Sequence, residues 1–128
     1  MIERFGSGGP YEERIGYSRV VRAGNLFTTA GCTSVVNGEL VHEGDPYQQT
    51  VTAFGIGLDA LAAAGCPLDN VVQTRMYITD AANADEVGRA HHDVFAGVRP
   101  SSAMIVVAGF IDPGMLVEVE LVGWAEPR

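Results

Sequence analysis

The sequence has few cysteines, few histidines and no long apolar run. Its longest apolar stretches, residues 104–108 and 115–117, are far shorter than the roughly 20 residues that span a membrane. Its first residues contain no apolar segment of the kind found in secretory signals. Two cysteines and three histidines in scattered positions argue against a disulfide scaffold and a zinc site. We therefore expect a cytoplasmic protein with reduced thiols, no membrane contact, no metal and no cofactor.

Positive charge is also scarce. Lys and Arg number 8 against 16 Asp and Glu, which gives a formal net charge of −8 over 128 residues. Because a negative field repels phosphate groups, this balance argues against a nucleic-acid partner. Hydrophobic residues make up 47% of the chain and charged residues 19%, which favours one folded domain over residues 1–128. Since so little charge leaves apolar surface uncovered, we expect an oligomer.

The first half of the chain predicts hairpins. β-prone runs at 17–22 and 26–30 flank a Gly-Asn turn, and a second turn falls at Asn37-Gly38. Gly31 follows the second run, where a backbone without a side chain can approach a ligand closely.

A helix is predicted next. Asp45 is a typical N-cap, Pro46 suits the first helical position, and Gly65 ends the helix. Its apolar residues repeat at spacings of three and four: Tyr47, Val51, Phe54, Leu58 and Leu61. A glycine inside a helix costs about 1 kcal/mol relative to alanine. We therefore expect Gly55 and Gly57 to allow close packing against a sheet.

The second half predicts strands around another helix. The predicted strands are 70–79, 103–108 and 115–122. The helix between the first two begins after Asp80 or Asn83 and ends at Gly97. Its apolar stripe is Val87, His91, Val94 and Phe95. The order predicts an α+β domain, a mixed sheet with two helices on one face, whose other face packs against further copies of the chain.

Several polar side chains have two interpretations. Glu118 and Glu120 share one face of the last strand. Either they belong to a solvated face or a charge-protected edge, or at least one of them lines an interface pocket. Arg75 lies mid-strand and either pairs with one of these carboxylates or extends to solvent at the sheet edge. His91 is a core or interface histidine on one interpretation and a catalyst on the other.

The stretch Arg99-Pro100-Ser101-Ser102 predicts a sharp turn into a strand. Proline favours an extended conformation at the residue before it, here Arg99. Neither serine belongs to a nucleophile elbow or a Ser/His/Asp order, so both are interpreted as turn residues.

Four segments together resemble the Rid family, also called YjgF or L-PSP endoribonuclease-like. They are residues 16–31, 65–80, 99–107 and 113–122, and the resemblance extends over nearly the whole chain. It implies a chorismate-mutase-like fold and a homotrimer, with the sheets packed as a central barrel and ligand clefts between subunits. The best-known branch hydrolyses enamines and imines such as 2-aminoacrylate.

The resemblance also implies site residues and departures from the pattern. Glu120 would position or activate a water, and Tyr17 and Gly31 would contact the ligand. Ser102 stands where the branch has its carboxylate-clamping arginine, Ala30 where it has a pocket serine, and Met104 where it often has cysteine. Losing the guanidinium removes the main carboxylate anchor, so the resemblance argues against 2-aminoacrylate as the substrate.

Arg19, Arg75 and His91 look characteristic of a subgroup of the family that lacks the carboxylate-clamping arginine. Arg19, Arg75, His91 and Glu118 are further candidates for the ligand cleft. The sequence therefore predicts an imine or enamine hydrolase on another small metabolite. The alternative is a non-catalytic ligand-binding or regulatory trimer, and the net charge of −8 argues against a ribonuclease.

Overall fold

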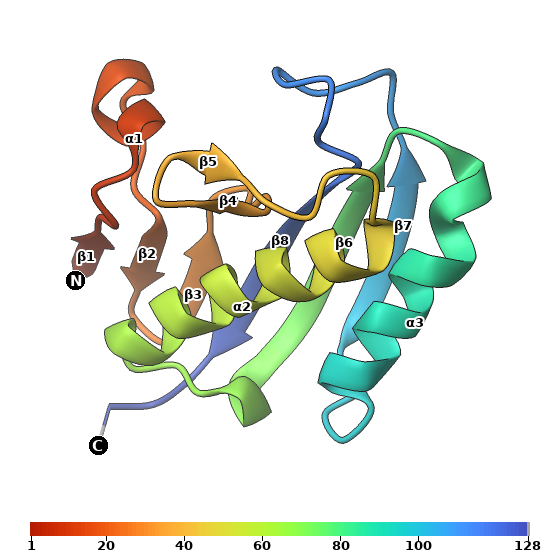
Figure 1. Ribbon diagram of the computed structural model, residues 1–128. Coiled ribbons are helices and arrows are strands. Elements are labelled where there is room, and N and C mark those ends of the chain that lie inside the picture. Colours follow the sequence, from red (N-terminus) through yellow and green to blue (C-terminus); the bar gives the residue numbers. More distant parts are fainter. Residues whose placement is uncertain (128) are drawn as a thin grey trace.

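A six-stranded sheet forms the centre of the fold in the computed structural model, which describes residues 1–127 (Figure 1). Its strands are β1 (Ile2–Phe5), β2 (Val20–Ala23), β3 (Leu26–Thr29), β6 (Val71–Ile78), β7 (Ser101–Val106) and β8 (Val117–Trp124). Their spatial order is β1-β2-β3-β8-β6-β7, and among these six strands only β6 and β7 pair in parallel. A separate two-stranded hairpin joins β4 (Val35–Val36) to β5 (Glu39–Leu40).

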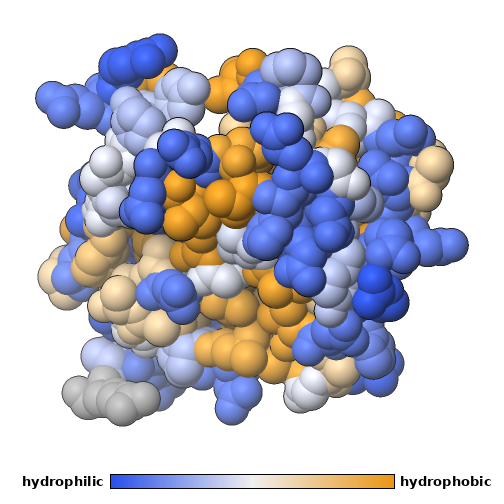
Figure 2. Space-filling view, in the orientation of Figure 1, coloured by the Kyte–Doolittle hydropathy of each residue, from blue (hydrophilic) through white to orange (hydrophobic). Residues whose placement is uncertain are grey.

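Two long helices lie on one face of this sheet. They are α2 (Pro46–Ala64) and α3 (Ala84–Phe95), and α3 is the crossover that makes the β6–β7 pair parallel. Short 3-10 turns, η1 (Leu68–Asn70) and η2 (Ala81–Asn83), precede β6 and α3. The prediction of an α+β domain with a mixed sheet and two helices on one face is confirmed. Hydrophilic side chains cover much of this helical side, with smaller hydrophobic areas between them (Figure 2).

The caps of α2 are those that the sequence predicts. The Asp45 side chain accepts a hydrogen bond from the Gln48 backbone N–H at 3.0 Å, and Gly65 ends the helix with φ of 110°. The buried stripe is rotated from the predicted one. Phe54 and Leu61 are buried as expected, but Tyr47, Val51 and Leu58 are only half-buried. Small residues, Ala53, Gly57 and Ala64, complete the buried face, so α2 lies close to the sheet.

The two glycines of α2 differ in their surroundings. A Cβ added at Gly57 would lie 2.5 Å from Leu121 Cδ1 and 3.4 Å from Cys32 Sγ, so close packing against the sheet accounts for this glycine. A Cβ at Gly55 would meet nothing within 4 Å. The expectation that Gly55 packs closely is therefore wrong, because it lies on the opposite side of the helix.

Alanine substitution should separate the two positions. Gly55→Ala is expected to raise the free energy of unfolding by about 1 kcal/mol, since only the backbone entropy changes. Gly57→Ala should lower it, because displacing the fully buried Leu121 side chain costs about 1–3 kcal/mol and outweighs the helix gain. Urea unfolding at one protein concentration measures both changes. Equal effects at the two positions would contradict the packing described for Gly57.

The core lies between the sheet and the two helices. Phe54 of α2 and Phe95 of α3 meet edge to face, with ring centroids 4.9 Å apart, and neither is exposed by more than 1%. Val117, Val119 and Leu121 of β8 point into the same cluster. Alternation along β8 therefore sends Glu118 and Glu120 to the opposite face of the sheet.

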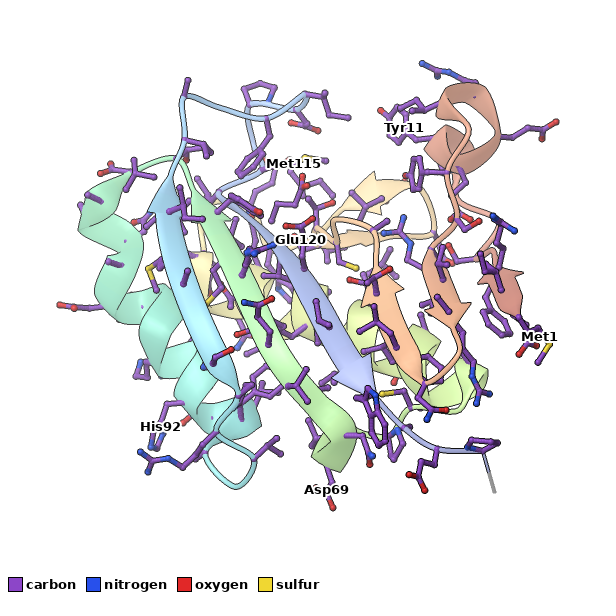
Figure 3. All side chains as sticks on the ribbon, turned by 180° about the vertical axis from the view of Figure 1, so that it is seen from behind. Met1, Tyr11, Asp69, His92, Met115 and Glu120 are labelled. Carbon is purple, nitrogen blue, oxygen red and sulfur yellow. The ribbon has the colours of Figure 1, made fainter. Side chains whose placement is uncertain are left out.

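This opposite face carries no helix from the described part of the chain (Figure 3). Register places Arg75 directly across from Glu120 and Tyr77 across from Glu118 on it. Leu26, Ile105 and Trp124 also belong to this face and are 43%, 40% and 48% exposed. We name it the open face; it combines polar side chains near its middle with exposed apolar side chains toward its ends.

Two local features differ from the sequence expectation. The N-terminal residues, for which no element was predicted, form β1 and the short helix α1 (Pro10–Ile15). Arg99 is not extended but has φ of 58°, because its backbone N–H closes the end of α3 on the Phe95 carbonyl at 2.8 Å. At Arg99, the hydrogen bond that ends the helix therefore outweighs the extended conformation that a following proline favours.

Candidate functional site

A pocket of about 720 Å³ opens at one end of the sheet. Its walls come from α1 and the loop before it, the end of β3 and the residues after it, the β4–β5 hairpin and the loop between β7 and β8. Tyr11 on α1 and Met115 ahead of β8 lie on either side of this end of the molecule (Figure 3). Most lining side chains are apolar, and two carry charge: Arg19 and Glu118.

Glu118 is the carboxylate of this pocket. Its side chain lies against the backbone of Gly31, where an added Cβ would overlap the carboxylate. The missing side chain at Gly31 therefore makes room for the Glu118 carboxylate. Burial raises the pKa of the Glu118 carboxyl above its usual value, the charge of Glu120 adds to the rise, and Arg19 opposes it. A carboxyl of this kind is suited to accept and return a proton.

The two terminal nitrogens of Arg19 contact protein groups, and its buried Nε has no hydrogen-bond partner within residues 1–127. Its Nη1 donates to the Gly31 carbonyl at 2.7 Å and its Nη2 to the Tyr17 hydroxyl at 3.4 Å. The Glu12 carboxylate lies 3.8 Å from Nη2, and the arginine side chain is only 12% exposed. The guanidinium therefore fixes the backbone after β3 and orients Tyr17, both of which line the pocket.

Glu12 is a residue that the sequence analysis missed. It is 8% exposed and accepts hydrogen bonds from the backbone N–H groups of Ser7 at 2.9 Å and Gly9 at 3.1 Å, and from the Ser7 hydroxyl. Burial opposes its charge, but these bonds and the nearby Arg19 together lower the pKa of Glu12. Its signal in the sequence is an acidic residue two positions after Pro10, a pattern of helix starts.

The thiol of Cys32 lies in the pocket wall but is not activated. Burial raises the pKa of Cys32, and the neighbouring Arg19 only partly offsets this effect. Cys32 is 1% exposed, and its backbone pairs with Val119 of β8. Both cysteines of the chain are free and buried. A neutral buried thiol is not a nucleophile, so Cys32 has a packing role.

Glu120 and Arg75 lie outside the pocket, on the open face. The Tyr77 hydroxyl donates a hydrogen bond to Glu120 Oε1, and this bond raises the pKa of the Tyr77 phenol. Arg75 is exposed and lies across from Glu120 in the strand pairing. The family resemblance implies Glu120 as the residue that activates water; of the two carboxylates, it is Glu118 that lines the pocket described above.

His91, Ser102 and Met104 lie on the helical side of the sheet. Thr74 of β6, fully buried, donates to the Ser102 hydroxyl at 2.8 Å and lies 2.8 Å from His91 Nε2. The Thr74 hydroxyl therefore links the Ser102 hydroxyl and the His91 ring. Met104 faces Gly88 of α3. None of the three lines the pocket described above.

His91 should make stability depend on pH. It packs against Phe54 and Phe95, with ring centroids 5.5 and 4.7 Å away, and burial lowers its pKa from 6.5. The unfolded chain then binds the proton more readily, so the free energy of unfolding should fall as pH drops below about 6.5. Urea unfolding between pH 5 and 8 measures this slope. His91→Gln should reduce it, and the exposed His92→Gln is the matched control; an unchanged slope in His91→Gln would contradict the assignment.

Within residues 1–127, no three His, Cys, Asp or Glu side chains come together in a way that could hold a metal ion. None of the helices in this part of the chain is both long and apolar enough to cross a membrane. Tyr17, Gly31, Arg19 and Glu118 are the sequence-predicted candidates that the fold brings together.

Fold and pocket define a small α+β protein with a ligand-sized cavity at the end of its sheet. The sequence model of the family described as "Endoribonuclease L-PSP" matches residues 11–124. The chain therefore belongs to this family, which is also the YjgF or Rid family, as the sequence resemblance predicted.

Individual relatives agree with this assignment. The chain is 42% identical over 120 residues to the "Uncharacterized protein SCO2049" of Streptomyces coelicolor, covering 94% of this chain and 90% of that protein. The crystal structure of Rv2704 from Mycobacterium tuberculosis, a member of the YjgF/YER057c/UK114 family, superposes with a TM-score of 0.87 at 37% identity, covering 98% and 100% of the two chains. A putative endoribonuclease from Thermotoga maritima shares the fold, with a TM-score of 0.81 at 24% identity over 97% and 93% of the chains. The predicted YjgF-like fold is confirmed.

Proposed function

We propose that the protein hydrolyses imines or enamines of a small metabolite other than 2-aminoacrylate, with Glu118 as the general base and acid. The observation that carries the proposal is the Glu118 carboxylate in the wall of a ligand-sized pocket, beside Gly31. Its raised pKa suits a group that takes a proton from water and later returns it. Membership of the Rid family supports the same chemistry.

The reaction needs only water and one proton-transferring group. Water attacks the carbon of a protonated imine, and Glu118 takes a proton from the water oxygen, so that a neutral carbinolamine forms. Glu118 then returns the proton to the nitrogen. The C–N bond breaks, its electron pair leaves with the nitrogen as ammonia, and the hydroxyl group passes its proton to the ionised Glu118 as the carbonyl forms. Ammonia takes up this proton and leaves as ammonium. Tyr17, oriented by Arg19, would hydrogen-bond the ligand during these steps.

Covalent routes have less support from the residues present. All eight Lys and Arg residues are arginines, so no lysine can form a Schiff base with the substrate. The Cys32 thiol has a raised pKa and is 1% exposed. Among the pocket residues, a carboxylate acting on water is the mechanism that the side chains favour.

Two substitutions argue against 2-aminoacrylate itself. Ser102 replaces the arginine that holds the substrate carboxylate in the best-known branch, and its hydroxyl is bonded to Thr74 on the helical side of the sheet. Ala30, which lines the pocket, replaces a serine of that branch. A substrate that depends on both groups would therefore bind poorly here.

The proposal includes a homotrimer with its clefts between subunits. The open face carries exposed Leu26, Ile105 and Trp124, which a packed copy would cover. Ile111 at the pocket rim is 74% exposed, so a copy in contact with the rim would also close the pocket. Analytical ultracentrifugation tests this part: a species of three chains, about 41 kDa, supports it, and a stable monomer refutes it.

Turnover of imines made in place by oxidases tests the catalytic proposal. The purified protein is added to a flavin oxidase and its amine or amino-acid substrates, and the disappearance of each imine is measured with semicarbazide as a trap. Faster loss of at least one imine, dependent on Glu118, supports the proposal. Loss at the uncatalysed rate for every substrate in the panel refutes it.

A non-catalytic, ligand-binding trimer is the second candidate. The absence of arginine at position 102 and of serine at position 30 favours it, because those groups belong to the hydrolytic branch. A ligand that binds in the pocket without being turned over would favour this second function over the hydrolase. The ribonuclease activity in the family's name has little support here: the net charge is −8, and Arg19, the one basic side chain that lines the pocket within residues 1–127, is bonded internally.

A further inference from the structure

The charged side chains of the pocket determine which charge on a ligand is favourable. Among the lining side chains within residues 1–127, Arg19 is the one cation and Glu118 the one anion. Their situations differ. Arg19 is bonded to Gly31 and Tyr17 and paired with the carboxylate of Glu12. Its terminal nitrogens are therefore engaged within the protein, and its Nε, which has no partner within residues 1–127, is buried away from a ligand.

Glu118, in contrast, is free to meet a ligand. Within residues 1–127, no side chain forms a hydrogen bond or an ion pair with its carboxylate. The charged side chains that affect the pKa of Glu118 are Glu120 and Arg19. The carboxylate lies at the pocket wall beside Gly31, which has no side chain to cover it. An ammonium or iminium group entering the pocket would find an unpaired partner there.

The remaining wall favours an apolar body on the ligand. Ile15, Val35, Ile56 and Met115 contribute aliphatic surface, and Tyr11 and Tyr17 contribute rings. Within residues 1–127, the lining side chains offer no free cation to balance a ligand carboxylate beside Glu118. Because like charges repel strongly in a partly desolvated site, such a ligand would bind weakly.

We infer that the pocket selects a protonated amine or imine that carries an apolar group and no carboxylate. For the imine, this inference rests on the proposed function and names its substrate class: imines derived from amines rather than from amino acids. For the amine, it concerns binding alone and does not depend on turnover.

Binding of three matched probes tests the charge preference. Phenethylamine, 2-phenylethanol and phenylacetate share a phenyl group and differ in charge, and calorimetry or NMR titration measures their affinities. We expect phenethylamine to bind at least about tenfold more tightly than phenylacetate. Glu118→Gln should weaken phenethylamine by about 30-fold while leaving 2-phenylethanol nearly unchanged, which also reports that the variant is folded.

A matched control removes a carboxylate elsewhere. Asp69 is exposed and lies at the end of the sheet away from Met115 and Glu120 (Figure 3), so Asp69→Asn lowers the negative charge equally without changing the pocket. Its affinity for phenethylamine should equal that of the wild type. The inference is overturned if phenylacetate binds as tightly as phenethylamine, if phenethylamine does not bind, or if Glu118→Gln does not weaken it.

Two imines that differ by one carboxylate separate this inference from the proposed function. A flavin amine oxidase makes the imine of phenylacetaldehyde from phenethylamine, and an amino-acid oxidase makes the imine of phenylpyruvate from phenylalanine. We expect kcat/KM to be at least about tenfold higher for the first. Equal or faster hydrolysis of the second would leave the hydrolase intact and overturn the inference. Glu118-dependent amine binding without turnover of either would refute the hydrolase and support the inference.

Discussion

Glu118→Gln should lower kcat for imine hydrolysis by about 10²–10⁴-fold, the range that general acid–base groups contribute. The change keeps the shape of the side chain and removes its ability to take a proton. Glu118 lines the pocket beside Gly31, and burial raises the pKa of its carboxyl. Stopped-flow or trap assays with imines made in place give kcat for both proteins.

Glu120→Gln is the comparison that distinguishes the two carboxylates. Glu120 lies outside the pocket and is bonded to Tyr77 on the open face, so its loss should cost less than about tenfold in kcat. The reverse order, with Glu120→Gln the more damaged variant, would contradict the role proposed for Glu118 and support the role that the family resemblance implies for Glu120. Thermal melting of both variants establishes that each is folded.

Phe54→Ala should lower the free energy of unfolding by about 3–5 kcal/mol, as is typical of a large buried aromatic side chain. Phe54 is fully buried and packs edge to face against Phe95 and His91. Its loss leaves a cavity where α2, α3 and β8 meet, which the rigid sheet cannot fill. Urea unfolding at a fixed protein concentration measures the change, since an oligomer's stability depends on concentration.

The partly exposed Leu68→Ala serves as the control for Phe54. Leu68 is 38% exposed, so its truncation should change the free energy of unfolding by only about 0.5 kcal/mol. A loss below about 1 kcal/mol in Phe54→Ala would contradict the central place of this ring in the core.

Local chemistry accounts for the elements that the sequence predicted well. The capping of α2 by Asp45 and its end at Gly65 depend on neighbouring backbone groups, so they can be recognised from a short stretch. The strands also follow from local alternation, although β7 and β8 each lie two residues from the predicted bounds. In contrast, β1 is held by pairing with β2, a contact between distant segments that no local pattern reveals.

The site residues show where a periodic pattern stops being informative. Period two places Glu118 and Glu120 on one face, and only the position of Gly31 against β8 separates the pocket carboxylate from its neighbour. Ser102 is assigned to the helical side by its register with Thr74, which depends on how β7 aligns with β6. For Gly55 and Gly57, helix geometry alone was decisive: positions two apart lie about 200° apart, so both could not face the sheet.

The two edge strands of the sheet differ in how readily they can pair with a strand of another molecule. The outer strand β1 is short, four residues, and carries Glu3 and Arg4, which discourage pairing with another molecule. The other outer strand, β7, has six residues, no charge and no proline. An edge of this kind recruits further strands. A newly made chain therefore carries an aggregation hazard at β7, and any contact that buries this edge would remove the hazard.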